Sequence, residues 1–486
     1  MTSDAALFQA YAARDRRFDG VFYVGVTSTG IYCRPVCTAR TPRQAHCRFF
    51  RSAAEAERER FRPCLRCRPE LAPGNAPVDD AHRVASLVAY RIDEGMLDDG
   101  GGLEAIAEQF GWSSRQIRRV VRREMGVSPM ELVLTRRLLL AKQLLTETEL
   151  PITEVAFASG FGSLRRFNDA FSGRYGMPPT RFRKAAERGM PAAAGTFTLQ
   201  LSYRPPFDWA ALLRFLGARA LAGVESVRDD SYARTVRLGS HSGSIRVRDL
   251  PARRVLAVEI SHSLMPVVPP LLGRLRNLFD LSARPDLIAD RLARDPLLEP
   301  AIRERPGLRV PGAFDGFELA VRAILGQQIT VKAATTIAAR FVERFGDPIE
   351  TPDAALTRLA PAAAQVAGVS LDEVAGLGII ESRARGIIAL AGEVASGRLR
   401  LEPGADPAAT MEQLTALAGL GGWTAQYIAM RALRWPDAFP KEDVVVRARL
   451  GGVTAARAEA ASQAWRPWRS YATMYLWQPG AAGTSS

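Results

Sequence analysis

The chain has 486 residues, more than one hydrophobic core usually organises, so we expect about three or four domains. Lys and Arg total 65 against 51 Asp and Glu, and the resulting net charge of +14 favours an anionic partner such as nucleic acid, although an Arg-rich composition alone gives the same excess. No apolar run approaches the length of a membrane span, and the amino terminus lacks the basic and then apolar order of an export signal, so we expect a cytoplasmic protein.

The first expected element is a metal site, because all five cysteines lie before residue 68. Two close pairs separated by 26 residues suit a tetrahedral thiolate site, and the natural ion is zinc. The expected ligands are Cys33, Cys37, Cys64 and Cys67. Cys47 stands alone between the pairs and is interpreted as a non-ligand, while His46 could bind only by displacing a cysteine. Four buried structural cysteines without a metal are the alternative.

The strings TSTGIYCRPVCTAR (27–40) and FRPCLRCRP (61–69) resemble the metal-binding domain of Ada-type adaptive-response proteins. The resemblance implies that the four cysteines hold zinc and that Cys33 irreversibly takes a methyl group from a methylphosphotriester in DNA. Zinc with four thiolates carries 2 − 4 = −2, and methylation of one sulfur brings the site to −1, which reduces its repulsion from DNA. A purely structural zinc domain is the rival interpretation.

A Pro- and Gly-containing linker (71–80) precedes a helical segment, about 81–186, with two similar units. Each has an apolar stripe, a glycine turn, a serine cap (Ser113 or Ser114, then Ser163) and a second helix with basic side chains. This pattern predicts two helix-turn-helix units whose second helices contact DNA. The expected DNA-contacting arginines are Arg115, Arg118, Arg119, Arg165 and Arg166. A merely solvated basic face is the alternative.

Between the two units, Ser128 and Glu131 form a capping box that opens a long helix ending before Pro151. Two helix-turn-helix units joined by such a helix resemble the AraC-type DNA-binding domain over the whole segment. Ada-type proteins place the same domain after their zinc domain, so the order of the segments supports both resemblances.

A second linker (188–197) is followed by the alternating string TFTLQLSY, which predicts a strand. Further strands are predicted for SYARTVRLG and GSIRVRDL, which Gly-Ser turns separate, and for VLAVEIS, which continues the sheet. With helices expected near 208–221 and 267–279, residues 197 to about 285 should form a small α+β domain. The residues of this domain alone do not indicate its function.

The carboxyl-terminal part, from about 286, is helical and contains the stretch LAGLGGWTAQYIAMRALRWPDAFPKED (417–443). Gly419, Gly421 and Gly422 predict a tight hairpin that leaves helix amides free to bind a DNA phosphate. Trp423 and Tyr427 lie one turn apart on the next helix, and the chain then presents the Asp443 carboxylate. A phosphate site, aromatic rings and a carboxylate together suit chemistry on a flipped base.

The strings PPFDW (205–209), RAILGQQIT (322–330), GLGGWTAQYIAMRALRWPDAFP and WRPWRSYATMYLW (465–477) are similar to AlkA-type 3-methyladenine DNA glycosylases, and the similarity covers about 197–480. It implies a helix-hairpin-helix glycosylase with an added sheet domain. It further implies that Asp443 is the catalytic aspartate and that aromatic side chains surround the base. These are Phe215, Trp423, Tyr427 and Trp477.

Three positions refine the expected reaction. Trp423 stands where bifunctional relatives carry a lysine nucleophile, so no Schiff base and no strand cleavage are expected. Gln328 replaces the leucine that fills the gap left by the flipped base, and we expect it to contact DNA there. Glu442 is the alternative working carboxylate. The chain also lacks a Pro-Cys-His-Arg string, so repair of O6-methylguanine is not expected.

The sequence therefore predicts a multidomain protein, mainly α with α+β parts, in four segments: a zinc domain (1–78), an AraC-type domain (81–186), an α+β domain (197–285) and a glycosylase domain (286–480). The expected function is a zinc-dependent alkylation sensor and transcription activator fused to a monofunctional glycosylase for alkylated purines. Double-stranded DNA is the expected partner, and RNA polymerase is a candidate. The alternatives are a regulator whose glycosylase half only binds DNA, and a repair enzyme whose amino half only anchors it.

Overall fold

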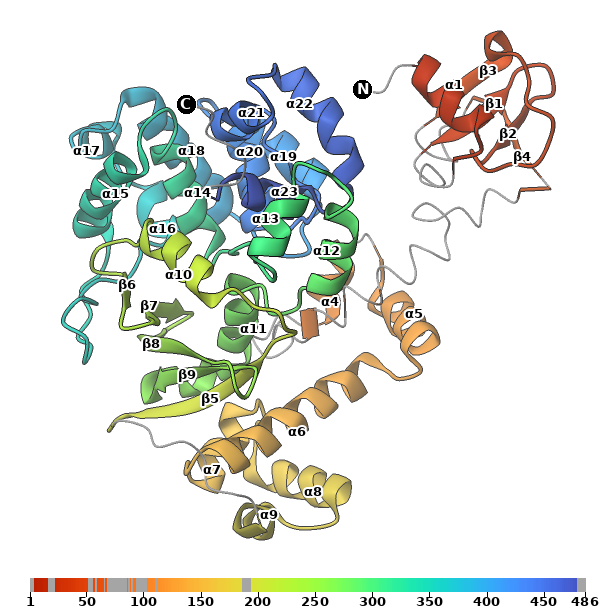
Figure 1. Ribbon diagram of the computed structural model, residues 1–486. Coiled ribbons are helices and arrows are strands. Elements are labelled where there is room, and N and C mark those ends of the chain that lie inside the picture. Colours follow the sequence, from red (N-terminus) through yellow and green to blue (C-terminus); the bar gives the residue numbers. More distant parts are fainter. Residues whose placement is uncertain are drawn as a thin grey trace. The chain divides into compact units, whose positions relative to one another are not determined.

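The computed structural model describes residues 4–15, 22–50, 56, 59–64, 66–67, 85, 88, 91–92, 103–109, 112–185 and 194–478 (Figure 1). The chain forms two compact units, Met1–Arg136 and Arg137–Ser486. The expected helix-turn-helix segment is thus divided between them. The linker predicted at 71–80, most of the one predicted at 188–197, and Gly111 lie outside the described residues. Within the described residues no helix is long and apolar enough to cross a membrane.

The first unit contains a small sheet in the order β3-β1-β2-β4, beside helix α1. Its elements are α1 (Asp4–Ala12), β1 (Tyr23–Val26), β2 (Ile31–Cys33), η2 (Gln44–His46), β3 (Cys47–Phe50), β4 (Arg62–Pro63), α4 (Leu103–Gln109) and α5 (Ser114–Met125). β1 pairs antiparallel with β2 and β3, and β4 pairs parallel with β2. This pairing brings Cys64, directly after β4, to the same end of the sheet as Cys33.

The expected caps of the helix-turn-helix units are present. Ser113 caps α5 and forms a capping box with Gln116. Ser128 accepts the Glu131 amide at 3.3 Å, while the Glu131 carboxylate accepts the Ser128 amide at 2.7 Å, and this box opens α6 (Pro129–Glu147). Ser163 caps α8. The sequence therefore located the start of each of these helices, because capping is a local interaction.

The second unit contains the second helix-turn-helix unit, a five-stranded sheet and a helical body. Its first elements are α7 (Ile152–Ala158), α8 (Leu164–Tyr175), α9 (Pro179–Ala185), β5 (Thr196–Ser202), α10 (Trp209–Gly217), β6 (Glu225–Arg228), β7 (Ser231–Leu238), β8 (His241–Leu250), β9 (Val255–Ser261), η4 (His262–Val267) and α11 (Val268–Leu278). The four strands that the sequence predicts are β5, β7, β8 and β9. The sequence missed β6, which turns into β7 through Asp229 and Asp230, both at positive φ.

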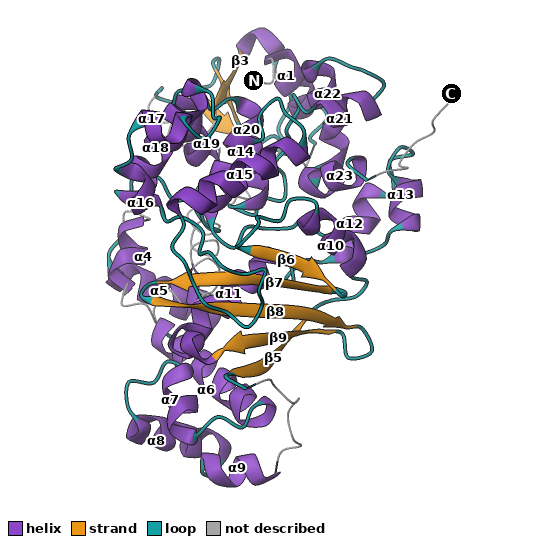
Figure 2. Ribbon diagram, turned by 90° about the vertical axis from the view of Figure 1, so that its left-hand side faces the viewer, coloured by secondary structure: helices purple, strands orange, loops and turns teal. Residues whose placement is uncertain are grey.

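The sheet is antiparallel throughout, in the order β5-β9-β8-β7-β6, and it links two helical groups (Figure 2). On the β5 edge, Gln143 of α6 donates to the Gln200 carbonyl at 2.7 Å, and Glu147 accepts the Gln200 amide at 2.8 Å. At the other edge, Glu225 of the edge strand β6 pairs with Arg322 of the helical body at 2.8 Å, and Arg234 of the adjacent strand β7 pairs with Glu318 at 2.6 Å. Both edges of the sheet are therefore held by side chains of neighbouring helices.

The helical body carries the hairpin predicted from the sequence. Its elements are α12 (Pro285–Leu292), α13 (Glu299–Glu304), α14 (Gly316–Leu325), α15 (Val331–Phe345), α16 (Ala363–Ala367), α17 (Leu371–Ala375), α18 (Glu381–Ala395), α19 (Pro407–Ala416), α20 (Gly422–Arg431), α21 (Val444–Arg449), α22 (Ala455–Ala461), η5 (Ser462–Trp465) and α23 (Arg469–Leu476). Buried side chains of α14, α15, α18 and α20 contribute to one apolar core. A second core runs from α6–α8 through the sheet to α23. α20 lies where these two cores meet.

Candidate functional site

The hairpin between α19 and α20 is closed by Gly419, whose φ of +85° favours glycine. A Cβ there would lie 3.0 Å from the Ser382 carbonyl oxygen, so the turn also packs closely on α18. Gly421 is the N-cap of α20, which begins at Gly422, and no side chain of the described residues caps this helix. The Gln327 side-chain amide supports the turn by donating to the Gly419 carbonyl at 3.0 Å. Within the part of the chain that the structure describes, the first amides of α20 therefore have no capping side chain and can receive a phosphate oxygen.

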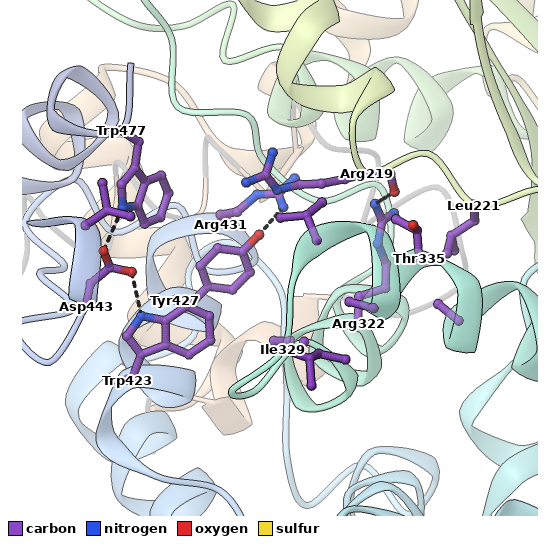
Figure 3. A pocket seen from close by; sticks show the side chains of 16 residues that line it. Arg219, Leu221, Arg322, Ile329, Thr335, Trp423, Tyr427, Arg431, Asp443 and Trp477 are labelled. Atoms are coloured by element: carbon purple, nitrogen blue, oxygen red, sulfur yellow. Dashed lines mark hydrogen bonds between the residues drawn. The ribbon is translucent and has the colours of Figure 1, made fainter. Parts of the chain in front are cut away.

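Asp443 is the N-cap of α21, and three donors fix its carboxylate, of which Figure 3 shows the two indole groups. Oδ2 accepts the indole N–H of Trp423 at 2.9 Å. Oδ1 accepts the indole N–H of Trp477 at 3.1 Å and the Val446 amide at 2.9 Å. The donors come from three separate helices or helix ends. This arrangement holds the carboxylate in one orientation at the wall of a cavity.

The cavity has a volume of about 360 Å³, and aromatic rings form the wall beside Asp443. Trp423 and Tyr427 are stacked, with centroids 5.2 Å apart and planes 12° apart. Trp477 lies 6.2 Å from Tyr427 at an angle of 44°. The structure thus brings together four of the residues that the sequence singled out, although Trp423 and Trp477 are far apart in the chain. A flat ring can enter this cavity and stack against them.

Three arginines also line the cavity, and the sequence reasoning missed all of them: Arg219, Arg322 and Arg431. Arg431 is buried. Its guanidinium group donates to the Tyr427 hydroxyl at 2.6 Å and to the Pro311 carbonyl at 2.8 Å. Burial alone would raise the pKa of Tyr427, but the positive charges of Arg431 and Arg219 outweigh it and the pKa is lowered. A signal existed in the sequence, because Trp423, Tyr427 and Arg431 follow one another at four-residue spacing on one helix face.

Phe215 is placed differently from the expectation. It is buried and stacks on Trp477 with centroids 6.5 Å apart and planes 15° apart. The guanidinium carbon of Arg219 lies 3.9 Å from the centre of its ring. Phe215 is not among the residues that line the cavity, and Arg219, one turn further along the chain, is. Phe215 therefore supports the Trp477 ring and the Arg219 side chain from behind.

Gln328 and Glu442 lie on the surface near these elements. Gln328 is exposed in the turn between α14 and α15, with φ of +54°. Its neighbour Gln327 is held by the hairpin, so the turn has a fixed position relative to Gly419. Glu442 is exposed, and its carboxylate lies beside Gly422 rather than in the cavity lining. Of the two adjacent carboxylates, Asp443 alone has the two indole donors.

The first unit holds the candidate metal centre. The ligand atoms of Cys33, Cys37, Cys64 and Cys67 all lie within 4.8 Å of one another. Tetrahedral zinc with Zn–S bonds of about 2.3 Å needs sulfurs roughly 3.8 Å apart, so the four side chains fit the ion. The Arg34 amide donates to the Cys67 sulfur at 3.3 Å, a contact that favours a thiolate. Cys33 is only 4% exposed.

Cys47 and His46 lie outside this group of four. Cys47 begins β3 and its thiol donates to the Arg43 carbonyl at 3.6 Å, while burial raises the pKa of the thiol. The His46 side chain is exposed at the end of η2. Neither residue belongs to the cluster that could hold the metal.

The arginines of the two helix-turn-helix units are exposed, while the opposite faces of their helices are buried. On α5 these are Arg115, Arg118 and Arg119, and on α8 they are Arg165 and Arg166. The buried side is formed by Ile117, Val120 and Val121 on α5 and by Phe167 and Phe171 on α8. Weak contacts at 3.9 Å (Arg118–Glu104) and 4.0 Å (Arg165–Asp169) leave these cations available to phosphates.

Comparison with known proteins identifies four segments. Residues 6–70 match the metal-binding domain of Ada, 106–185 a helix-turn-helix domain, 198–315 the AlkA N-terminal domain, and 321–469 the HhH-GPD superfamily of base excision DNA repair proteins. The ranges follow the order that the sequence predicted. The match to the metal-binding domain and the cysteine cluster agree that the protein's cofactor is zinc.

Relatives cover the whole chain and each half. A probable bifunctional transcriptional activator/DNA repair enzyme AlkA of Mycobacterium tuberculosis is 39% identical over 97% of this chain and 95% of its own length. DNA-3-methyladenine glycosylase 2 of Escherichia coli is 35% identical over 57% of this chain and 95% of its own length. The bifunctional transcriptional activator/DNA repair enzyme Ada of Escherichia coli is 32% identical over 38% of this chain and 50% of its own length. The fold is similar to that of a solved structure, the 3-methyladenine DNA-glycosylase from Archaeoglobus fulgidus. The similarity covers 57% of this chain and 96% of that chain, with a TM-score of 0.50 and 20% sequence identity.

Proposed function

Because the chain belongs to the family of bifunctional transcriptional activator/DNA repair proteins that join an Ada-like regulator to an AlkA-like glycosylase, we propose that it removes alkylated purines from DNA and switches on repair genes when its zinc domain is methylated. The glycosylase step is hydrolysis of the N-glycosidic bond, without strand cleavage. Double-stranded DNA is the substrate and the regulatory target, RNA polymerase is the expected partner of the activator half, and the cytoplasm is the expected compartment.

The observation that carries the glycosylase proposal is the Asp443 carboxylate, fixed by two indole N–H groups beside stacked rings. A purine alkylated on a ring nitrogen is cationic, stacks on the electron-rich rings of Trp423 and Tyr427, and leaves as a neutral base. The bond that breaks is the glycosidic bond between the purine N9, which is not the alkylated nitrogen, and the sugar C1′, and both electrons leave with the base. Asp443 stabilises the positive charge that develops on the sugar, and water supplies the hydroxyl group.

Other residues support binding rather than bond cleavage. Trp423 occupies the place of the nucleophilic lysine of bifunctional relatives, so no amine is present there to attack the sugar. The free amides at the start of α20 receive a phosphate, with Gly419, Gly421 and Gly422 allowing the close approach. Gln328, exposed at the neighbouring turn, contacts DNA in the gap that the flipped base leaves.

The regulator half works by a stoichiometric transfer to Cys33. The Cys33 thiolate, which zinc would hold together with Cys37, Cys64 and Cys67, attacks the methyl carbon of a methylphosphotriester, the C–O bond breaks, and the phosphodiester oxygen keeps the electron pair. The sulfur becomes a thioether, and with zinc bound the charge of the site would change from −2 to −1, which would strengthen its binding to DNA. Since Cys33 is 4% exposed, the DNA phosphate must approach the sulfur closely. The arginines of α5 and α8 then hold the promoter.

Release of 3-methyladenine from alkylated DNA tests the glycosylase. The purified protein should release the base and Asp443→Asn should not. Equal release by both proteins would overturn the catalytic assignment, and release by neither would favour a regulator whose second half only binds DNA. For the sensor, a mass gain of one methyl group on the amino-terminal part should accompany tighter promoter binding. Unchanged promoter affinity after methylation would indicate that the amino half only anchors the enzyme.

A further inference from the structure

The end of the cavity away from Asp443 has a different chemical character from the aromatic end. Figure 3 shows Trp477, Asp443 and Trp423 on one side, with Tyr427 in the middle and the side chains of Arg219, Arg322, Leu221 and Thr335 beyond it. A ring that lies along Trp423 and Tyr427, with its sugar bond at Asp443, therefore has its far edge near the Tyr427 hydroxyl. The side chains beyond that hydroxyl therefore contact any substituent that the base carries on its far edge.

The three arginines at this end are not equally neutralised. Arg322 is paired with Glu225 at 2.8 Å and with Glu318 at 3.2 Å, and these carboxylates also face the buried Arg234. This cluster contains two carboxylates and two guanidinium groups, so its charges balance. Arg322 therefore adds shape and hydrogen-bond donors to the cavity but little net charge.

Arg219 and Arg431 have no such carboxylate partner within the described residues. Arg219 donates to the Phe215 carbonyl at 3.3 Å and stacks on the Phe215 ring. Arg431 donates to the carbonyls of Pro311 and Gly312 and to the Tyr427 hydroxyl. These partners are neutral. Two uncompensated positive charges therefore face the cavity in surroundings that exclude much of the water.

This charge is a poor match for a simple methylated purine. The ring of such a base is cationic, so the arginine end repels it, and a methyl group offers no acceptor to the guanidinium groups. The same positive charge lowers the pKa of Tyr427. A formal negative charge at this position would satisfy the donors and balance the cation of the ring. The remaining lining is small or aliphatic (Leu221, Ile329, Ala334, Ala338), which leaves room for a short alkyl chain.

We propose that the arginine end of the cavity is a subsite for a carboxylate on the N-alkyl group of the flipped purine, with Arg219 as its main ligand. The enzyme then excises N-carboxyalkylated purines in preference to their methyl counterparts. The purine cation stacks on Trp423 and Tyr427, and the carboxylate accepts from Arg219, the less buried of the two uncompensated arginines. This inference rests on the proposed glycosylase function and adds a substrate class to it.

The test compares 7-carboxymethylguanine with 7-methylguanine in otherwise identical DNA duplexes. The two bases share ring, oxo group and leaving-group chemistry, and they differ in the carboxylate alone. Single-turnover excision should favour the carboxymethyl base at least tenfold in the unaltered protein. Arg219→Leu should bring the ratio close to one, and Arg219→Lys should keep part of it. Arg214→Leu, which changes an exposed arginine of α10 five residues before Arg219, should leave both rates unchanged.

A second measurement does not depend on catalysis. The Asp443→Asn protein is titrated with the two free bases, and binding is followed by tryptophan fluorescence. The carboxymethyl base should bind at least tenfold more tightly, and the added substitution Arg219→Leu should abolish the difference. Equal binding of the two bases, or a preference that survives Arg219→Leu, would overturn the proposal. If neither base is excised while the titration shows the preference, the subsite stands and the proposed glycosylase reaction fails.

Discussion

Replacing Asp443 with Asn removes one negative charge and keeps the shape of the side chain. At roughly 4 Å from a developing sugar cation, and with an effective dielectric constant of about 20, that charge contributes about 4 kcal/mol. Each 1.4 kcal/mol corresponds to about a tenfold change in rate, so we expect excision to slow by roughly a thousandfold. Asn remains a good helix cap and can still accept the Val446 amide.

The same substitution has a smaller effect on stability. The new amide group donates hydrogen bonds, so it cannot accept from both Trp423 and Trp477, and one indole N–H loses its partner. The expected cost is about 1–3 kcal/mol in the free energy of unfolding. Single-turnover release of 3-methyladenine measures the first effect, and denaturant unfolding measures the second. Glu442→Gln is the matched control, because this adjacent carboxylate is exposed, and it should retain full activity.

Two results would refute this reasoning. The first is an Asp443→Asn protein that excises at more than about a tenth of the original rate, because the charge would then matter little. The second is an equal loss in Glu442→Gln, which would move the working carboxylate to the neighbouring residue. A large fall in stability without a fall in rate would assign Asp443 to structure rather than to chemistry.

Four further changes test other parts of the molecule. Trp423→Phe keeps the stacking on Tyr427 but removes one hydrogen-bond donor to Asp443. Excision should slow by roughly ten- to a hundredfold, because a hydrogen bond to a charged group contributes about 1.5–3 kcal/mol. An unchanged rate would contradict this prediction. Cys64→Ser should lower the zinc content from one ion per chain in elemental analysis, with full retention speaking against the four-cysteine site. Arg234→Met leaves the two buried carboxylates of Glu225 and Glu318 with one guanidinium partner, Arg322, and should cost about 3–5 kcal/mol in denaturant unfolding. No change would mean that Arg322 compensates alone. Burial raises the pKa of the Glu147 carboxyl group, so the fold favours its protonated form, and the stability that this form contributes is lost as the pH rises through the raised pKa. Glu147→Gln should therefore raise the melting temperature at pH 7. A lower melting temperature would refute the direction of this effect.

The sequence by itself determined the features that depend on near neighbours in the chain. The spacing of the cysteine pairs predicted the metal ligands, because each pair needs only a short loop to reach one edge of the tetrahedron. Ser113, Ser128 and Ser163 located helix starts, since a cap bonds to amides three residues away. Alternation in one string and Gly-Ser turns between the next two helped to locate four of the five strands of the larger sheet, but β6 has four residues and is too short to show a clear pattern.

The tertiary structure alone decided what surrounds Asp443. Trp423 and Trp477 meet its two oxygens from helices 20 residues before it and 34 residues after it, and no local pattern encodes that convergence. Phe215 stacks on Trp477 behind the cavity wall, whereas Arg219, in the turn after α10, lines the cavity. Local patterns thus predicted the metal ligands and the helix caps, whereas contacts between distant segments determined the charge of the cavity beside Asp443.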